Sequence, residues 1–589
     1  TEWDWDGFMT YIWLGDGVNP KDFESKLPAF VDEQHGEQLE RFASGLKFYL
    51  QPITDIHLYS DYMMEYKPNG DGQITYFLLV IAIFIIVIAW VNYINLATAK
   101  SMERAKEVGI RKVMGSFRKQ LMSQFFIESV VLNLIAAILS LFIIYLALPL
   151  FNQLAGRSLT LSFADPQLWM TITGLFLFGG LLSGIYPAIV LSGFKPVSVL
   201  KGKIQNTSKG AILRKGLVVF QFFASLVLMV GTYIVFSQLS HMRSQNLGVK
   251  VEQTLVVKGP NVTDSLYSDK LNTFKNSLVS YSSINSITAS TAVPGEQPDW
   301  NAGGIRLVEE DDSESNQYRV IGMDYDFVNA YGLEVLEGRS FDRERTTDQN
   351  TVLLNEAGAK LIGFDTYKEA LNRDMFFWGD TFKIVGVVKN YHQESLKKSF
   401  EPLVFRLIPN ASNYYSLKVN TEGLNSTIDL IEEEWMAMFP GNPFDFFFLD
   451  DHFEKQYRAD VQFGQVFGLF ASLAIFIACL GLFGLASYMT AQRTKEIGVR
   501  KVLGASISSI LTLLSKDFTK LILIAVIFAV PLSWWVMSDW LESFAYKMKL
   551  SWWVFAIPAI VLLSVALFTV SFQTLKAAWA NPVDSLRNE

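Results

Sequence analysis

The chain has 589 residues, of which 50% are hydrophobic and only 18% charged, and its formal net charge is −8. Soluble proteins usually carry about 25% charged residues, so this composition excludes an ordinary soluble protein. The single cysteine, Cys479, excludes an intrachain disulfide framework, and the five histidines show no metal-ligand spacing.

Seven apolar runs are each long enough to cross a bilayer as a helix, which takes about 20 residues. In chain order they are 76–97, 125–148, 168–192, 214–237, 464–487, 518–540 and 552–574. One such run would fit a buried helix of a soluble core, but seven together do not. The sequence therefore predicts an α-helical polytopic membrane protein.

Lysine and arginine gather in three of the connections between these spans. The basic connections lie at 100–119, 195–215 and 493–501. Loops that stay in the cytoplasm are enriched in basic residues, and alternation of the spans places these three on the same side. The large segments 1–75 and 238–463 are then expected on the outer side.

The insert 238–463 reads as an α+β domain. Three short stretches bounded by turn residues are predicted strands: Gln253–Lys258, Phe382–Lys389 and Tyr415–Val419. Two stretches have helical spacing, Asn355–Leu361 and Ser426–Phe439. Residues 1–75 show a similar mixture, which predicts a related fold for that segment.

The chain repeats itself, which is its most informative feature. Arg104–Ser116 recurs with conservative changes as Arg493–Ala505, and Lys195–Leu200 recurs as Asn581–Leu586. Spans one to three therefore match spans five to seven, and because both motif loops face the same side, the halves are parallel repeats. By this symmetry an intact protein would have eight spans, seven of them present here.

The repeat also suggests domain boundaries. Residues 1–75 would be the C-terminal part of a first periplasmic domain in an N-terminally truncated chain. The other predicted segments are a three-span membrane domain at 76–200, a cytoplasmic linker at 201–213, one span at 214–237, a second periplasmic domain at 238–463 and a second three-span membrane domain at 464–589.

Within the two basic loops an acid, two bases and two glycines recur at fixed offsets. They are Glu107, Gly109, Arg111, Lys112 and Gly115 in the first loop, and Glu496, Gly498, Arg500, Lys501 and Gly504 in the second. The preference for basic cytoplasmic loops explains the bases, but it gives no reason to repeat the acids and glycines. These ten residues are the candidate site for contact with a cytoplasmic partner.

The terminal glycines suggest how each loop folds. Gly115 and Gly504 are expected to end a helix in the left-handed conformation. The residues that follow, Arg118–Gln124 and Ser506–Ser515, are predicted to form short amphipathic helices along the membrane surface. Such helices can dock into a groove on a partner. One docking helix per half implies two partner copies.

Two acids lie at equivalent places near the cytoplasmic ends of spans two and six: Glu128 and Asp517. One interpretation is a helix-terminal acid at the membrane interface, stabilised by the helix dipole. The other is an acid that pairs with the basic loop of its own half. The span centres otherwise hold almost no ionisable groups, which disfavours an ion-driven transporter.

The sequence shows no recognisable catalytic motif. The sequence contains no G-x-x-x-x-G-K-[ST] phosphate loop, no H-E-x-x-H motif and no G-x-S-x-G motif. The chain is therefore predicted to be non-catalytic, with no cofactor, catalytic residue or metal site of its own. Any energy source would come from another protein or from an ion gradient.

The loop motif resembles that of the MacB/FtsX-type ABC transporter permeases, in the long duplicated form similar to those of Bacteroidota. The resemblance rests on Glu107–Ser116 and Glu496–Ala505, and on the Pro-Val-x-x-Leu tails Pro196–Leu200 and Pro582–Leu586. Short sequence motifs in the outer domain add to this resemblance, among them Met323–Phe327 and Ile384–Lys389.

The resemblance implies a permease subunit in the inner membrane of a bacterial cell, with large domains in the periplasm. ATP and magnesium would be bound by a cytoplasmic ABC ATPase in two copies, seated on the two loops as coupling helices. ATP binding would move the periplasmic domain, a mode called mechanotransmission. Family substrates are drugs, peptides and lipoproteins, a periplasmic adaptor is an optional partner, and nucleic acid is not expected.

A second function stays open from the same residues. A membrane-anchored signalling or scaffold protein, regulating periplasmic enzymes or a sensor kinase, would need the same spans and the same cytoplasmic loops. The sequence alone does not separate transport from signalling.

Overall fold

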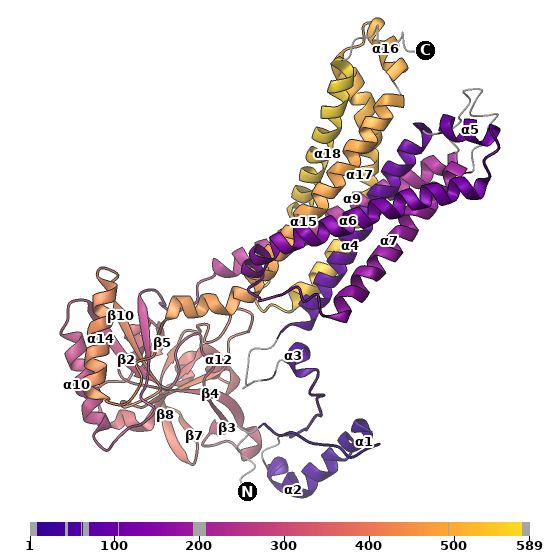
Figure 1. Cartoon of the computed structure of the whole chain (residues 1–589). Coiled ribbons are helices and arrows are strands. Elements are labelled where there is room, and N and C mark those ends of the chain that lie inside the picture. Colours follow the sequence, from indigo (N-terminus) through magenta and orange to yellow (C-terminus); the bar gives the residue numbers. More distant parts are fainter. Residues whose placement is uncertain are drawn as a thin grey trace. The chain divides into compact units, whose positions relative to one another are not determined.

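The computed structural model describes residues 9–41, 45–60, 62, 70–103, 105–192, 208–492 and 494–579. They divide into two compact units (Figure 1). The α/β unit lies within 1–71, 242–459 and 543–546, and the helical unit lies within 72–241, 460–542 and 547–589.

The helical unit is built of long apolar helices, because in lipid a chain has to satisfy its backbone hydrogen bonds within itself. Its elements are α4 Gly72–Glu103, α5 Ala105–Val113, α6 Arg118–Ala155, α7 Pro166–Ser192, α9 Ser208–Arg243, α15 Leu449–Gln492, α16 Thr494–Val502, α17 Ile507–Glu542 and α18 Trp553–Trp579. Helix α15 begins in the α/β unit and continues into this one.

Six of the seven predicted spans coincide with helices that are long and apolar enough to cross a membrane. The remaining predicted span, 168–192, falls on α7, a helix of 27 residues. The side-chain surroundings of its second half lie outside the described residues. The predicted eighth span has no counterpart in this sequence and stays a prediction.

The two repeats meet where α4 packs on α15. Asn92 on α4 donates its Nδ2 hydrogen to the backbone oxygen of Ile477 at 3.2 Å. A β-carbon on Gly481 would overlap Asn92 Oδ1 and would lie 3.1 Å from Gln221 Nε2 of α9. Glycine at this position therefore lets three helices approach closely, as small residues do between membrane helices.

The α/β unit contains an eleven-stranded sheet flanked by short helices. Its strands are β1 Thr254–Lys258, β2 Ile284–Ser290, β3 Trp300–Leu307, β4 Asn316–Met323, β5 Val335–Gly338, β6 Thr351–Asn355, β7 Asp374–Phe377, β8 Asp380–Val388, β9 Leu403–Leu407, β10 Tyr414–Val419 and β11 Phe446–Phe448. Its helices are α10 Tyr267–Val279, α11 Phe327–Ala330, α12 Glu356–Leu361, α13 Tyr367–Ala370 and α14 Leu424–Met438, with 3₁₀ turns η1 Asp312–Glu314 and η2 Thr346–Asn350.

The sheet order shows two lobes. Strands β11-β1-β10-β2 are antiparallel neighbours, and α10 and α14 connect them in a split βαβ pattern. Strands β4-β3-β7-β8-β6-β9 form a ring, because β9 pairs in parallel with β4 in the register Arg319↔Leu403. Alternate residues of the ring strands, such as Met375 and Phe377 of β7, form one buried core.

The three predicted strands and two predicted helices of 238–463 are confirmed as β1, β8, β10, α12 and α14, with ends shifted by at most a few residues. The strands expected within residues 1–75 have no counterpart among the described residues of that segment. The described part of that segment forms helices α1 Pro20–Glu24, α2 Leu27–Arg41 and α3 Ile56–Tyr59, and no strand. A strand needs a neighbour for its backbone hydrogen bonds, and the described part of this segment pairs with none.

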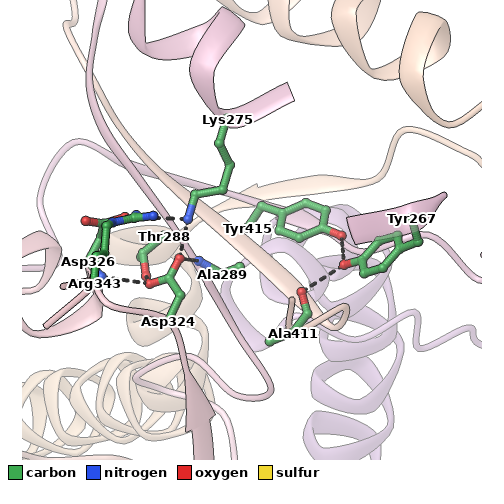
Figure 2. A network of polar contacts seen from close by, with 9 residues as sticks. All are labelled: Tyr267, Lys275, Thr288, Ala289, Asp324, Asp326, Arg343, Ala411 and Tyr415. Carbon is green, nitrogen blue, oxygen red and sulfur yellow. Dashed lines mark hydrogen bonds and ion pairs between the residues drawn. The ribbon is translucent and has the colours of Figure 1, made fainter. Parts of the chain in front are cut away.

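A buried ion pair joins the two lobes (Figure 2). Lys275 of α10 donates to Asp324, which follows β4, and the exposed fraction of the two side chains is 10% and 1%. Asp324 also accepts hydrogen bonds from Thr288 Oγ1 at 2.5 Å and from the backbone nitrogen of Ala289 at 2.7 Å. The carboxylate is thus fully satisfied, as a buried charge has to be.

A second contact closes the core beneath α10. The hydroxyls of Tyr267 and Tyr415 lie 2.6 Å apart, and Tyr267 donates to the backbone oxygen of Ala411 at 2.9 Å (Figure 2). Burial raises the pKa of Tyr267 to about 12, so this hydroxyl keeps its proton at neutral pH.

Replacing Lys275 with methionine should leave the Asp324 carboxylate buried without its counter-charge. Removing one partner of a buried pair costs about 3–5 kcal/mol, so we expect the α/β unit to unfold about 10 °C lower in the K275M variant. Thermal unfolding of the full chain in detergent measures this. The matched control is Lys270→Met on the same helix, which breaks the more exposed pair with Asp264. Equal effects of the two variants would contradict the assigned role.

Candidate functional site

The two repeated motifs fold into two short helices. Helix α5 covers Ala105–Val113 and α16 covers Thr494–Val502, nine residues each. Each precedes the next long helix, α6 or α17, and Figure 1 shows both near helix ends of the helical unit. The candidate residues therefore lie on equivalent elements in both halves. Arg104 and Arg493 lie outside the described residues.

The repeated acid and base form the same ion pair in both helices. Glu107 Oε1 lies 2.7 Å from Arg111 Nη2, and Glu496 Oε1 lies 2.8 Å from Arg500 Nη2. The spacing is i,i+4 with the acid first, the favourable orientation on a helix. All four side chains are roughly half exposed, so each pair contributes only about 0.3–0.5 kcal/mol to stability. The small contribution of these ion pairs to folding stability does not by itself explain why the Glu and Arg residues are repeated.

The repeated glycine ends each helix, as predicted. Gly115 has φ +99° and Gly504 has φ +88°, which is the left-handed region. Past the first glycine, the nitrogen of Ser116 donates to the oxygen of Arg111 at 3.0 Å. Past the second, the nitrogen of Ala505 donates to the oxygen of Arg500 at 2.9 Å. This is the Schellman motif, and it turns the chain sharply into the next helix.

One face of each short helix packs against the start of the following helix. Val108 is 1% exposed and packs with Leu121 and Phe125 of α6. At the equivalent places of the second half, Ile497 packs with Ile510 of α17. The repeat thus preserves the packing as well as the motif.

The residues around the turn leave an apolar surface exposed in each half, and we call these surfaces the two tips. In the first tip the exposed apolar residues are Ile110, Val113, Met114 and Phe117, and in the second they are Val499, Val502, Leu503 and Ile507. Met114 and Leu503 occupy equivalent positions and are 83% and 80% exposed. Each tip therefore combines an apolar ridge with a half-exposed Glu–Arg pair.

The halves differ in what lies behind the ion pair. In the first half, Arg111 Nη1 donates to Gln124 Oε1 at 2.8 Å, and Gln124 Nε2 donates to Glu128 Oε1 at 3.2 Å. Glu128 is thus linked to its basic loop through Gln124. In the second half the position of Gln124 is taken by Leu513, ahead of Asp517. The internal repeat of the sequence does not point to Gln124, because that residue is not repeated.

The predicted amphipathic helices at Arg118–Gln124 and Ser506–Ser515 are not separate elements. These residues mostly form the first turns of α6 and α17, so this prediction is wrong. The reason is that the Schellman turn ends the motif helix, and no further break follows before the apolar span. The short helices are the motifs themselves.

Some candidate residues cannot be compared in detail. Gly109, Gly498 and Lys501 lie within α5 and α16, but their side-chain surroundings fall outside the described residues. The tails Pro196–Leu200 and Pro582–Leu586 lie there too. Lys112 is described: partial burial, and secondarily the charge of Arg118, lowers the pKa of its amine.

The arrangement is suited to binding a protein. The described residues contain no group of His, Cys, Asp and Glu arranged to hold a metal ion. An exposed apolar ridge beside fixed charges is instead typical of a surface that a partner covers.

Two family models match the chain. The FtsX-like permease C-terminal model matches twice, at 79–196 and 468–582, and the MacB-like periplasmic core domain model matches 218–428. The first model covers both repeats, each with its tip. The chain belongs to the FtsX-like, MacB-type family of ABC transporter permeases.

Relatives in the family match over part of their length. The uncharacterized ABC transporter permease YknZ of Bacillus subtilis is 29% identical over 176 residues, which are 28% of this chain and 43% of YknZ. The macrolide export ATP-binding/permease protein MacB of Escherichia coli is 29% identical over 149 residues, which are 25% of this chain and 22% of MacB. The matched part thus spans less than half of each of these relatives.

A solved structure is also similar to part of the chain. The periplasmic region of MacB from Actinobacillus actinomycetemcomitans is 16% identical and covers 36% of this permease and 95% of that structure, with a TM-score of 0.26. The duplicated FtsX-like match agrees with the repeat found in the sequence. It establishes a multi-pass membrane permease with a mixed α/β periplasmic or extracellular domain.

Replacing Gly115 or Gly504 with alanine should loosen the turn at the corresponding tip. An added β-carbon meets no neighbour at either position, so the cost comes from the left-handed backbone and is at least about 1 kcal/mol. Amide hydrogen exchange at Ser116 or Ala505 should become about 5- to 30-fold faster. The control is Gly216→Ala, a helical glycine of α9 with open space around it. Unchanged exchange at both tips would refute this reading of the glycines.

Proposed function

We propose that this permease is driven by a separate cytoplasmic ABC ATPase, which docks one subunit on each tip and moves the α/β domain through its nucleotide cycle. The observation that carries the proposal is the duplicated tip. An apolar ridge beside a Glu–Arg pair is presented twice, with the same fold and packing, by a chain that has no phosphate loop. Two equal docking elements suit an ATPase dimer, which would bind the ATP and magnesium.

Helix α15 supplies the route from tip to domain. Its first residue, Leu449, is 0% exposed in a core cluster of the α/β unit, and its last residue, Gln492, lies two residues before α16. Helix α15 is continuous from Leu449 to Gln492 and contains no proline, which is a common cause of sharp kinks. A movement of α16 is therefore passed along one continuous element.

In this proposal the tips face the cytoplasm and the α/β domain lies in the periplasm of a bacterial inner membrane, and the basic residues of the loops support this orientation. Export or extraction of a drug, peptide or lipoprotein is the transport class that the family resemblance supports, and the MacB relatives are named for macrolide export. A periplasmic adaptor fits this arrangement as a further partner.

The tips can be tested by placing a charge on each apolar ridge. In the double variant Met114→Asp/Leu503→Asp, co-purification of the partner ATPase should fall at least about tenfold, because each contact buries an apolar side chain worth about 1.5–3 kcal/mol. Val262→Asp, which adds a charge at an exposed apolar residue of the α/β domain, is the matched control. Full ATPase binding by the double variant would count against docking at the tips.

The repeated acids give an independent test. Replacing both Glu107 and Glu496 with arginine should uncouple transport and weaken ATPase association, while thermal unfolding of the chain changes little because the pairs are half exposed. The variant Glu107→Arg/Arg111→Glu keeps an ion pair within the helix but exchanges the charges. Wild-type transport in the double-arginine variant would show that the acids have no part in coupling.

Transport and signalling are distinguished by reconstitution with the ATPase in vesicles. Movement of a labelled drug, peptide or lipoprotein that depends on ATP supports transport. ATP turnover that moves none of them, but alters the activity of a periplasmic enzyme, supports the signalling alternative.

A further inference from the structure

One loop of the α/β unit, Tyr391–Phe400, holds three segments that lie far apart in the sequence. The nitrogen of His392 donates to the oxygen of Leu247, a few residues after α9, at 2.9 Å. The nitrogen of Leu396 donates to the hydroxyl of Tyr457, on the first turns of α15, at 2.8 Å. The loop thus contacts the chain just after it leaves one long helix and just after it enters another.

The third segment is the connection between α17 and α18. The nitrogen of Ala545 donates to the oxygen of Lys397 at 3.0 Å, and the Lys397 ammonium lies 5.7 Å from the ring centre of Phe544. Residues 543–546 accordingly belong to the α/β unit, although Glu542 ends α17 and Trp553 begins α18.

An aromatic cluster fixes this third contact. The ring of His392 is 5% exposed and lies 4.5 Å from the ring of Phe400 and 4.8 Å from that of Tyr546, centre to centre. Phe400 and Tyr546 are edge-on at 5.9 Å, so the three rings contact one another. Burial lowers the pKa of His392 to about 4, which keeps the imidazole uncharged among these rings at neutral pH. Edge-to-face ring pairs add attraction beyond simple burial.

The other half has no such arrangement among its described contacts. The equivalent connection, 156–165 between α6 and α7, belongs to the helical unit. It is held locally: Asn152 exchanges two hydrogen bonds with Leu159, and Trp169 donates to the oxygen of Phe163 at 2.8 Å. The α17–α18 connection is instead held by the α/β domain, and a few residues later the nitrogen of Met548 donates to Gln238 of α9 at 2.8 Å.

We propose that the loop Tyr391–Phe400 is a mechanical joint that makes the α17–α18 connection move together with the α/β domain, with His392 and Tyr546 as its positioning residues. The proposal deepens the proposed function, because it names the place where an ATP-driven movement of the domain reaches the last two membrane helices. The second half of the chain would then be coupled to the α/β domain in two ways: through α15 and through this joint.

The joint itself is tested in the full chain, in nanodiscs, without ATPase or nucleotide. Tyr546→Ala removes both ring contacts, and amide hydrogen exchange at Ala545 should become roughly tenfold faster. His392→Phe keeps a ring in place and should stay close to the wild type. Phe163→Ala, an aromatic residue removed from the equivalent connection, is the control and should leave Ala545 unchanged. Wild-type exchange at Ala545 in Tyr546→Ala would overturn the proposal.

Coupling is then tested with the partner ATPase bound. Spin labels on Asp380→Cys of the domain and Lys549→Cys of the connection, in a Cys479→Ser background, report the distance between them through the ATP cycle. A constant distance in the otherwise wild-type chain, and an ATP-dependent change once Tyr546→Ala is added, support the joint. An equal ATP-dependent change with and without Tyr546→Ala overturns it.

The proposed function and the proposed joint can be refuted independently of each other. If no ATPase binds to the wild-type chain, the proposed function fails, but the exchange measurement without ATPase still decides whether the rings hold the connection. If the ATPase binds and transport proceeds while exchange at Ala545 is insensitive to Tyr546→Ala, the joint alone is refuted.

Discussion

A chain that crosses lipid has to satisfy its backbone hydrogen bonds internally, and this constraint makes its spans long, unbroken helices. Helix α15 shows the consequence: 44 residues at 1.5 Å per residue give a rod of about 66 Å, roughly twice the thickness of the hydrocarbon core. One end is anchored in the core of the α/β domain and the other adjoins the α16 tip. In the proposed mechanism, movement of a tip would reach the α/β domain along this helix, whereas a flexible linker would absorb the movement instead of passing it on.

Duplication preserved the tips but allowed their supports to diverge. Both halves keep the Glu–Arg pair, the left-handed glycine and the buried contact from Val108 or Ile497. In the first half the arginine is linked to an acid of the next helix, Glu128, through Gln124, whereas Leu513 stands at the position of Gln124 in the second half. In the second half, the connection between α17 and α18 also contacts the α/β domain through the rings of His392, Phe400 and Tyr546. The two halves are thus alike at the tips, where they would meet a symmetric partner.

Much of this could be predicted from the sequence, because spans, repeats and basic loops depend on local composition. The spans, the strands β1, β8 and β10 and the helix-ending glycines followed from apolar runs, short β-branched stretches and repeated offsets. The continuation of Arg118–Gln124 and Ser506–Ser515 into the long helices α6 and α17 did not, since it depends on the turn that the backbone makes at Gly115 and Gly504. Lys275–Asp324 and the His392 cluster were out of reach, because each joins positions that are distant in sequence and carry no motif. Gln124 was missed because it is not repeated in the second half.

The first and last strands of the α/β domain are neighbours in its sheet. β1, its first strand, and β11, its last, are hydrogen-bonded neighbours in the register Leu255↔Phe448. A domain whose two ends lie side by side resembles a cassette, because another fold with similarly spaced ends could be joined to the same pair of helices. Such an exchange would have to replace a third attachment as well, the contact between the loop Tyr391–Phe400 and the connection from α17 to α18.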